Sequence, residues 1–285
     1  MLPPLSTLAC FKTVDAIVPI TAGLSSQCYQ VFADNKCFFA KQVTTTDEPL
    51  VNIYAASKNI SPSVIYHDNH WLITEFIAGD NLSLAQETLD KKIMLATKLM
   101  AQCHQLKVNV NKQVPENVIG SFMNEQAFLA QQFSTQQQNA LLRCSKDIIT
   151  SLNATADTTS KGHTNLVCCH GDINFSNIVL SLDQTAYLVD YECVCLAPAE
   201  YDLAMLVAVN NLNEDKLSLV IKLYQKHIHG DINQTRVKDY LQFCYFINGL
   251  WYAQAYNKSN LEQFVHLAKQ QWQHLPFQQN LFFNI

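Results

Sequence analysis

The chain has 285 residues, of which 48% are hydrophobic, and its 19 Lys and Arg against 24 Asp and Glu give a net charge of −5. A chain of this length forms one large domain or two unequal lobes, and its apolar content is sufficient for a sizeable core. The charge is mildly acidic and includes no basic block, so no nucleic acid partner is expected.

The sequence shows no sign of export or membrane insertion. Residues 1–30 lack a charged segment followed by an apolar core, and no apolar stretch is long enough to cross a bilayer. The ten cysteines are scattered through apolar runs, which is typical of reduced and buried thiols. We therefore expect a cytoplasmic protein with no membrane partner and no obligate protein partner.

The first part of the chain predicts a small antiparallel sheet. Segments 27–33 and 36–43 are rich in β-branched and aromatic residues, and they flank Asp34 and Asn35, a pair that tolerates the left-handed turn of a tight hairpin. The pattern then predicts a helix and one more strand, at 49–60 and 70–77.

Most of the remaining chain predicts helices. The polar residues 78–81 interrupt the pattern, and a capping box at Ser83 and Gln86 precedes an amphipathic helix over 89–106. Helical segments follow at about 122–152, and helices are expected again towards the C-terminus. Between these two helical regions, three short strands are expected at 166–169, 177–180 and 186–190.

The glycines exclude two common nucleotide motifs. The seven glycines are too widely spaced for either the dinucleotide fingerprint or the Walker A loop. Gly23 stands just before the first hairpin strand, where backbone N–H groups and the hydroxyls of Ser25 and Ser26 would approach a phosphate. The alternative is an ordinary turn with serines that face solvent.

The stretch HGDINFSNIV, residues 170–179, places an acid and an amide at the spacing of a phosphoryl-transfer loop. Asp172 and Asn177 bracket four residues, as in kinase loops where the Asp accepts a substrate hydroxyl proton and the Asn ligates Mg²⁺. Asp190 ends the next apolar strand, where kinases place a second carboxylate for Mg²⁺. His170 is expected to orient the loop through hydrogen bonds.

A positive charge for the nucleotide phosphates is expected upstream. Lys41 lies at the end of the second hairpin strand, where kinases place the lysine that contacts the α- and β-phosphates. An acid on the following helix orients such a lysine; Glu48 is the nearest candidate and Asp47 the second. The strand lysine, the loop and the strand-end aspartate occur in kinase order, and this combination indicates function more strongly than any one residue.

Together these motifs resemble the aminoglycoside phosphotransferase and choline kinase superfamily, the small-molecule branch of the protein-kinase-like fold. HGDINFSNIVL is similar to the catalytic loop of that branch, and LVDYECVCLAPAEYDLAML resembles the metal-binding segment of choline, ethanolamine and thiamine kinases. The resemblance implies an α+β fold of two lobes: a small antiparallel-sheet lobe over 1–78 that binds nucleotide, and a larger, mainly helical lobe over 79–285 with the catalytic loop and substrate pocket. ITEFIAGDNL resembles the linker between such lobes, whose backbone around Glu75 to Ile77 would bind adenine.

The resemblance also implies a substrate site. FCYFINGLWYAQAY is similar to the aromatic helix that closes the alcohol pocket of choline kinases. For a cationic substrate, Trp251 and Tyr252 would offer π faces, and Glu192 or Asp202 would offer a countercharge. Two alternatives remain open: Trp251 simply packs in an apolar core, and the two acids brace the catalytic loop.

The resulting expectation is a kinase that uses ATP and Mg²⁺ to phosphorylate the hydroxyl of a small metabolite. Asp172 would deprotonate the alcohol, Asn177 and Asp190 would hold Mg²⁺, and Lys41 would position the phosphates. Choline-, ethanolamine- or thiamine-like amino alcohols are the first expectation for the substrate. The alternatives are an aminoglycoside or other sugar-hydroxyl kinase, and a nucleotide-binding module without catalysis.

Overall fold

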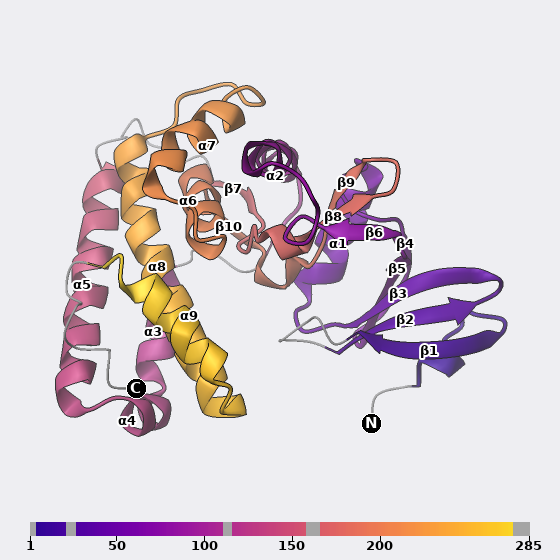
Figure 1. Ribbon diagram of the computed structural model, residues 1–285, viewed down its shortest axis with the longest axis horizontal. Helices are drawn as coiled ribbons and strands as arrows, with labels where there is room; N and C mark the ends of the chain where they lie inside the picture. Colours follow the sequence, from indigo (N-terminus) through magenta and orange to yellow (C-terminus); the bar gives the residue numbers. More distant parts are fainter. Residues whose placement is uncertain (1–3, 21–26, 111–115, 158–165, 276–285) are drawn as a thin grey trace. The chain divides into compact units, whose positions relative to one another are not determined.

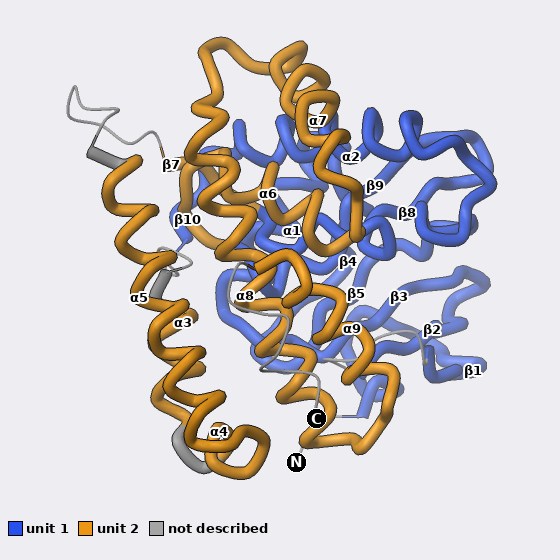
Figure 2. Tube along the Cα trace, turned by 60° about the vertical axis from the view of Figure 1, so that its left-hand side comes forward, with its two compact units in different colours: residues 1–112, 170–194 blue, residues 113–169, 195–285 orange. Residues whose placement is uncertain are grey.

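The computed structural model describes residues 4–20, 27–110, 116–157 and 166–275 (Figure 1). The chain divides into two compact units, residues 1–112 with 170–194 and residues 113–169 with 195–285 (Figure 2). The segment 170–194, which contains the expected catalytic loop, therefore belongs to the same unit as residues 1–112, although the two are far apart in sequence.

A five-stranded antiparallel sheet forms the N-terminal part of the first unit. Asp34 and Asn35 have φ values of 53° and 60° and form the turn of the expected hairpin, which is confirmed. Neither edge strand, at Val14–Ile20 and Val64–His67, was predicted; five of the seven residues of the first are exposed and give no alternating pattern. In spatial order, the strands are β1 (Val14–Ile20), β2 (Cys28–Ala33), β3 (Lys36–Gln42), β5 (Trp71–Glu75) and β4 (Val64–His67).

One face of this sheet carries the apolar core of the N-terminal region. Val31 and Ala40 are fully buried there, and the segment around the short helix η1 (Leu5–Thr7) covers them. The rings of Phe11 and Phe38 pack at a centroid distance of 5.3 Å. Because strand residues alternate between faces, the neighbours of these buried residues along β2 and β3 point to the opposite face.

Two helices complete the expected pattern in the first unit. Helix α1 (Asp47–Ser57) lies between β3 and β4, and α2 (Leu89–His104) follows the sheet. The capping box predicted at Ser83 is wrong: Ser83 donates to Asn81 Oδ1 at 2.5 Å in the preceding turn. The cap of α2 is Thr88, whose hydroxyl accepts from the backbone N–H of Lys91 at 3.3 Å.

A second sheet contains the polar segment that the sequence pattern treats as a break. Gly79 begins its first strand with a φ of 152°, and a Cβ at this position would lie 2.1 Å from the carbonyl oxygen of Leu180. A glycine is therefore required for this close pairing. The strands, in spatial order, are β6 (Gly79–Asn81), β8 (Ile178–Ser181) and β9 (Ala186–Leu188), and two short helices flank them, η2 (Phe175–Asn177) and η3 (Tyr191–Cys193).

The second unit is mainly helical. Its longest helix, α8, packs against α5, α6 and α9, and among the described residues no helix is long and apolar enough to cross a membrane. A short strand pair precedes the last helices; its second strand was not predicted. The elements are α3 (Glu116–Asn124), α4 (Gln126–Gln132), α5 (Thr135–Asp157), β7 (Leu166–Cys169), β10 (Cys195–Pro198), α6 (Ala199–Val209), η4 (Glu214–Lys216), α7 (Leu217–Tyr224), α8 (Gln234–Ser259) and α9 (Glu262–Trp272).

An antiparallel sheet near the N-terminus followed by a mostly helical remainder is the α+β composition that the sequence predicts. All ten cysteines are free; six are buried as expected, whereas Cys10, Cys28, Cys37 and Cys193 are only half-buried. The predicted lobe boundary between residues 78 and 79 lies inside the first compact unit and stays a prediction.

Candidate active site

Lys41 lies on the face of the five-stranded sheet opposite the apolar core. Its directly paired neighbours are Cys28 on β2 and Leu72 on β5, and paired residues point to the same face. Further along this face, Gln30 and Phe39 are only half-buried. The Lys41 ammonium is itself buried, so it stands beneath a surface of which part remains accessible.

The Lys41 ammonium contacts the acid that was expected as its partner. Its Nζ donates to Glu48 Oε1 at 2.5 Å, and the Glu48 side chain is completely buried. Glu48 stands in the first turn of α1, where a negative charge also interacts favourably with the helix dipole. The contact therefore involves Glu48, the first of the two acids considered.

Two further carboxylates reach the same ammonium from the segment after β9. Lys41 Nζ forms a hydrogen-bonded ion pair with Asp190 Oδ1 and lies 3.4 Å from Glu192 Oε2. These two side chains keep 31% and 21% of their surface exposed, in contrast to Glu48. One ammonium thus faces three carboxylates, which leaves excess negative charge that is open to solvent on one side.

The charges in this cluster shift the pKa values of its members. Burial alone would lower the pKa of Lys41, but the carboxylates of Asp190, Glu48 and Glu192 outweigh it and hold that pKa above its ordinary value. Burial raises the pKa of Glu48, and the charge of Lys41 offsets this only in part. Burial also raises the pKa of the neighbouring Cys28 thiol to about 11. Lys41 therefore remains a cation throughout the physiological range.

The loop after β7 holds Asp172 and Asn177 together. Asn177 Nδ2 donates to Asp172 Oδ2 at 2.8 Å and to the Asp172 backbone carbonyl at 3.1 Å. Asn177 ends η2, which begins after Asn174, a residue whose side chain accepts from the N–H of Ser176 at 3.0 Å. This local turn converts the five-residue separation of Asp172 and Asn177 in sequence into direct contact of their side chains.

His170 occupies the position of an internal support in this loop. Its Nε2 lies 3.0 Å from the carbonyl oxygen of Val189, and its Nδ1 accepts from the N–H of Asp172 at 3.3 Å. The ring is completely buried and packs on Tyr191 at a centroid distance of 4.8 Å. Both ring nitrogens are engaged with backbone groups, which supports the predicted orienting role.

The backbone on each side of this support is unusual. Asp190 has a left-handed conformation with φ 71° and ψ 68°, so the strand ends at Leu188, two residues earlier than the predicted strand. Gly171 has φ 81°, and a Cβ there would lie 2.2 Å from the backbone carbonyl oxygen of Cys193. Only glycine allows the loop and η3 to approach this closely.

Replacement of Gly171 by Ala is therefore expected to displace the loop. The left-handed backbone and the clash with a carbonyl oxygen should together cost at least about 1–3 kcal/mol of unfolding free energy. Chemical denaturation of both proteins measures this loss. Gly230→Ala is the matched control, because Gly230 has φ 120° but an added Cβ would meet nothing within 4 Å. Equal losses in the two variants would show that close approach to Cys193 is unimportant.

The side chains present fit a hard, oxygen-seeking cation such as Mg²⁺. Both hydrogen bonds of the Asn177 side chain to described residues use Nδ2, so Oδ1 remains an acceptor. Asp190 adds a carboxylate that is partly exposed and lies in a region of excess negative charge. Oxygen ligands of this kind are the set that Mg²⁺ prefers. Asn177 and Asp190 stay the proposed ligands.

The residues expected to bind the nucleotide base are at the end of β5. The N–H of Glu75 donates to the carbonyl of Ser63 at 2.9 Å, and Thr74 Oγ1 donates to the Glu75 carbonyl at 3.2 Å. Ile77 is half-buried and makes no backbone hydrogen bond to another described residue. The predicted phosphate-contacting residues Gly23, Ser25 and Ser26 lie outside the described residues.

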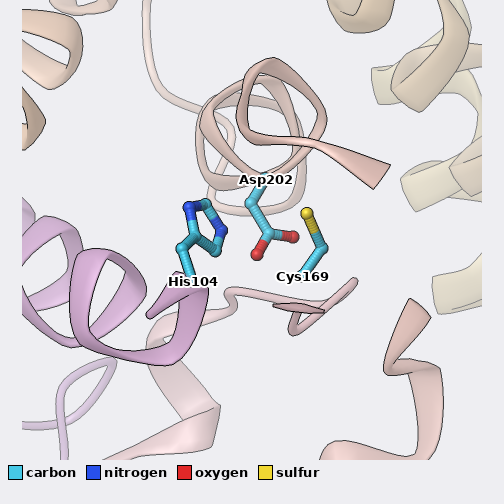
Figure 3. A group of neighbouring side chains, drawn as sticks. All are labelled: His104, Cys169 and Asp202. Atoms are coloured by element: carbon cyan, nitrogen blue, oxygen red, sulfur yellow. The ribbon is translucent and has the colours of Figure 1, made fainter. Parts of the chain in front are cut away.

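Of the predicted substrate residues, only Glu192 lies in the first unit. Asp202 belongs to the second unit, where it stands in the first turn of α6 and is completely buried. Its carboxylate points towards the thiol of Cys169 on β7 (Figure 3; His104, also labelled, is a residue of the first unit). Burial and then the Asp202 charge raise the pKa of the Cys169 thiol, which stays protonated.

The aromatic pair predicted on the C-terminal helix also belongs to the second unit. The rings of Trp251 and Tyr252 on α8 meet edge to face at a centroid distance of 5.3 Å, and Tyr252 stacks on Phe264 of α9 at 6.4 Å. Trp251 is 38% exposed. Trp251 is therefore not a fully packed core residue, and its role in substrate binding stays a prediction.

Sequence reasoning missed two contacts in the first unit. Glu192 was assigned only to the substrate or to bracing the catalytic loop, whereas its carboxylate lies beside Lys41. Ser61 was not singled out, although its buried hydroxyl contacts both Leu188 and Tyr191. The Asp-aromatic-Glu order at 190–192 signals the first contact; nothing in the sequence around Ser61 signals the second.

Comparison with known proteins adds independent information. A family model described as choline/ethanolamine kinase matches residues 39–279 of the chain. A search of the curated proteins finds no match. The matched residues include the Lys41 cluster, the loop around Asp172 and the aromatic pair on α8.

Solved structures of small-molecule kinases share the fold. Choline kinase from Cryptosporidium parvum Iowa II is 16% identical, with a TM-score of 0.68 over 90% of this chain and 88% of that chain. Plasmodium vivax ethanolamine kinase is 16% identical, with a TM-score of 0.66 over 90% and 80%. An AMP-bound spectinomycin phosphotransferase is 18% identical, with a TM-score of 0.65 over 92% and 94%. The predicted two-lobed, protein-kinase-like fold is confirmed.

Proposed function

The chain belongs to the choline/ethanolamine kinase family and is a small-molecule kinase, and from this premise we propose that it transfers the γ-phosphoryl group of ATP to the hydroxyl of a small amino alcohol. The observation that carries the proposal lies within the first unit. Asp172 is held by Asn177, and Lys41 is surrounded by Glu48, Asp190 and Glu192. These are a base, a cation for the phosphates and a set of metal-binding oxygens in one unit.

Nucleotide binding is proposed on the Lys41 face of the five-stranded sheet. The half-buried Gln30 and Phe39 lie on this face and leave surface for the base and ribose to cover. The backbone of Glu75 to Ile77 at the end of β5 is the proposed partner of the adenine edge. The related spectinomycin phosphotransferase was crystallised with AMP, which supports a nucleotide site in this fold.

Asp172 is the proposed base. As the alcohol oxygen bonds to the γ-phosphorus, its proton moves to the Asp172 carboxylate, and the broken bond leaves its electron pair on the bridging oxygen of ADP. Asn177 holds one carboxylate oxygen by donating to Oδ2, so the position of the base is fixed before substrate arrives. His170 supports the same loop through the N–H of Asp172.

Asn177 and Asp190 would hold Mg²⁺, and Lys41 would contact the nucleotide phosphates. Bound Mg²⁺ would supply positive charge that neutralises the phosphates during transfer. The ion pairs of Lys41 with Glu48, Asp190 and Glu192 keep its ammonium in one place despite its flexible stem. A bound cation would offset the excess of carboxylates over ammonium at Lys41.

An amino alcohol is the preferred acceptor. The accessible ring of Trp251, supported by Tyr252 and Phe264, is suited to a quaternary or primary ammonium through cation–π attraction. Structures of a choline kinase and an ethanolamine kinase share the fold. A sugar hydroxyl is the second candidate, because the fold is equally that of a spectinomycin phosphotransferase. Since free thiols persist in reducing compartments, we place the reaction in the cytoplasm.

An ADP-release assay with Mg-ATP tests the proposal directly. The panel should contain choline, ethanolamine, thiamine, spectinomycin, other aminoglycosides and simple sugars. We expect turnover with one of the amino alcohols and at least tenfold lower activity in Trp251→Leu at subsaturating substrate, because the cation–π contact is lost. Turnover only with spectinomycin or a sugar would favour the second candidate. ATP binding without product across the panel would favour a module without catalysis.

A further inference from the structure

We propose that Ser61 and Tyr191 form a positioning pair that sets the carboxylates of Asp190 and Glu192 for the metal-nucleotide complex. The proposal rests on the proposed function, because it assigns a role to residues that act on that same site. Neither Ser61 nor Tyr191 is the proposed base, the phosphate-contacting lysine or a proposed metal ligand. Both belong to the first unit.

The hydroxyl of Ser61 joins two segments that are far apart in sequence. Ser61 lies between α1 and β4, and its Oγ donates to the carbonyl oxygen of Leu188 at 2.8 Å. The N–H of Leu188 in turn donates to the carbonyl oxygen of Ile60 at 2.8 Å. The end of β9 is thus held by hydrogen bonds in both directions to the segment that follows α1.

The direction of the remaining hydrogen bond follows from the number of protons. Ser61 Oγ lies 2.7 Å from the hydroxyl oxygen of Tyr191. A serine hydroxyl has one proton, and that of Ser61 is already donated to Leu188, so the Tyr191 hydroxyl donates and Ser61 accepts. Ser61 is 3% exposed and Tyr191 is completely buried, so neither group exchanges this bond for one to bulk water.

Tyr191 connects this hydrogen bond both to the carboxylates beside Lys41 and to the loop of Asp172. Its chain neighbours Asp190 and Glu192 are the residues whose carboxylates reach Lys41. Its ring packs on His170, which accepts from the N–H of Asp172. A shift of Tyr191 therefore moves the turn at 190–192 directly and acts on the loop of Asp172 through the His170 ring.

The left-handed backbone of Asp190 indicates that the hydrogen bond between Tyr191 and Ser61 holds the turn at 190–192 in place. A non-glycine residue at φ 71° persists only where its surroundings hold it. The Tyr191 hydroxyl is an anchor one residue beyond Asp190, and Leu188 is an anchor two residues before it. Partners that orient metal ligands are typically worth 10- to 100-fold in metal affinity or activity when they are removed.

The test is a double-mutant cycle with Tyr191→Phe, Ser61→Ala and the combined variant. Phenylalanine keeps the ring on His170 and removes only the hydroxyl. The matched controls are Tyr66→Phe, whose hydroxyl bonds Asp68 at 2.8 Å, and Ser57→Ala, whose hydroxyl bonds the Tyr54 carbonyl at 2.7 Å. Calorimetry should compare the affinity for ADP with Mg²⁺ and for ADP without metal, which does not require turnover.

We expect each single variant to lose roughly tenfold of the affinity gained from Mg²⁺, with metal-free ADP binding unchanged. The double variant should lose no more than Ser61→Ala alone, since that substitution already removes the bond to Tyr191 together with the bond to Leu188. The double variant also removes the hydroxyls of Ser61 and Tyr191 together, so neither is left buried without the other. It therefore keeps the test possible if one single variant fails to fold.

Two results would overturn the positioning role. One is a lower melting temperature with an unchanged effect of Mg²⁺ on ADP affinity, which would make the pair a purely structural bond. The other is an additive loss in the double variant. The binding measurement separates failure of the positioning role from failure of the proposed function. If no alcohol on the panel were phosphorylated, the effect of Mg²⁺ on ADP binding could still be measured.

Discussion

Asp172→Asn is expected to lower kcat by roughly 10²- to 10⁴-fold while nucleotide affinity stays within about twofold. In the parent, Asn177 Nδ2 donates to Asp172 Oδ2 at 2.8 Å. The amide of the variant retains an oxygen that can accept this hydrogen bond, so the loop keeps its geometry. It cannot take the proton of the alcohol at neutral pH. The loss should therefore fall on the chemical step rather than on binding.

Single-turnover kinetics with the best alcohol of the panel, together with calorimetry of ADP binding, separate these two effects. Asp183→Asn is the matched control: Asp183 is exposed, and its carboxylate accepts from the N–H of Thr185 at 3.1 Å within the β8–β9 turn. It should retain parental kcat. If Asp172→Asn kept parental kcat, or if its loss appeared entirely in nucleotide affinity, Asp172 would not be the base.

The sequence was most informative where function depends on local spacing. Asp172 and Asn177 are close in the chain, and a single turn of η2 brings their side chains into contact. Lys41 and Glu48 are similarly close, separated by the end of β3 and the start of α1. Such pairs can be predicted because few backbone conformations connect residues at these separations.

The sequence was less informative where a long-range contact defines the role. Glu192 reaches Lys41 across 151 positions of the chain, and periodicity has no means of reporting such a contact. The strand β6 was read as a break because Gly79 and Asp80 disfavour strands, yet pairing with β8 overrides that local preference. Tertiary pairing therefore decided what propensity could not.

Edge strands were the other source of error. β1 is exposed along most of its length, and β10 is a four-residue strand in a two-stranded sheet. β1 has no buried face and β10 is buried at three of its four positions, so neither shows a regular alternation of apolar and polar residues. By contrast β3, which pairs with strands on both sides, was located to within one residue at its C-terminal end.

Asp190→Asn is expected to abolish detectable turnover and yet leave the nucleotide-free protein as stable as the parent, or more stable by about 0.5–2 kcal/mol. Three carboxylates surround the Lys41 ammonium, so removal of one charge relieves repulsion while Glu48 and Glu192 still pair with the lysine. Asparagine is also among the residues that best tolerate the left-handed backbone, here at φ 71°.

The loss of turnover has a different origin from the change in stability. A neutral amide is a weaker ligand for Mg²⁺ than a carboxylate, and loss of the cation removes several kcal/mol of charge stabilisation, at least about a hundredfold in rate. In the same variant, Mg²⁺ should no longer strengthen ADP binding. Chemical denaturation measures the change in stability. Calorimetry of ADP binding with and without Mg²⁺ measures the loss of the metal effect.

Asp190→Ala separates the charge from the backbone. It removes the same carboxylate but places a residue with no polar side chain at φ 71°, so it should lose turnover like Asp190→Asn and be less stable than that variant by about 1 kcal/mol. A destabilised Asp190→Asn would mean that the ion pair with Lys41 outweighs the repulsion among the carboxylates. Metal-dependent turnover in Asp190→Asn would remove Asp190 from the proposed ligands. The charge excess at Lys41 thus predicts that function and stability change in opposite directions at one residue.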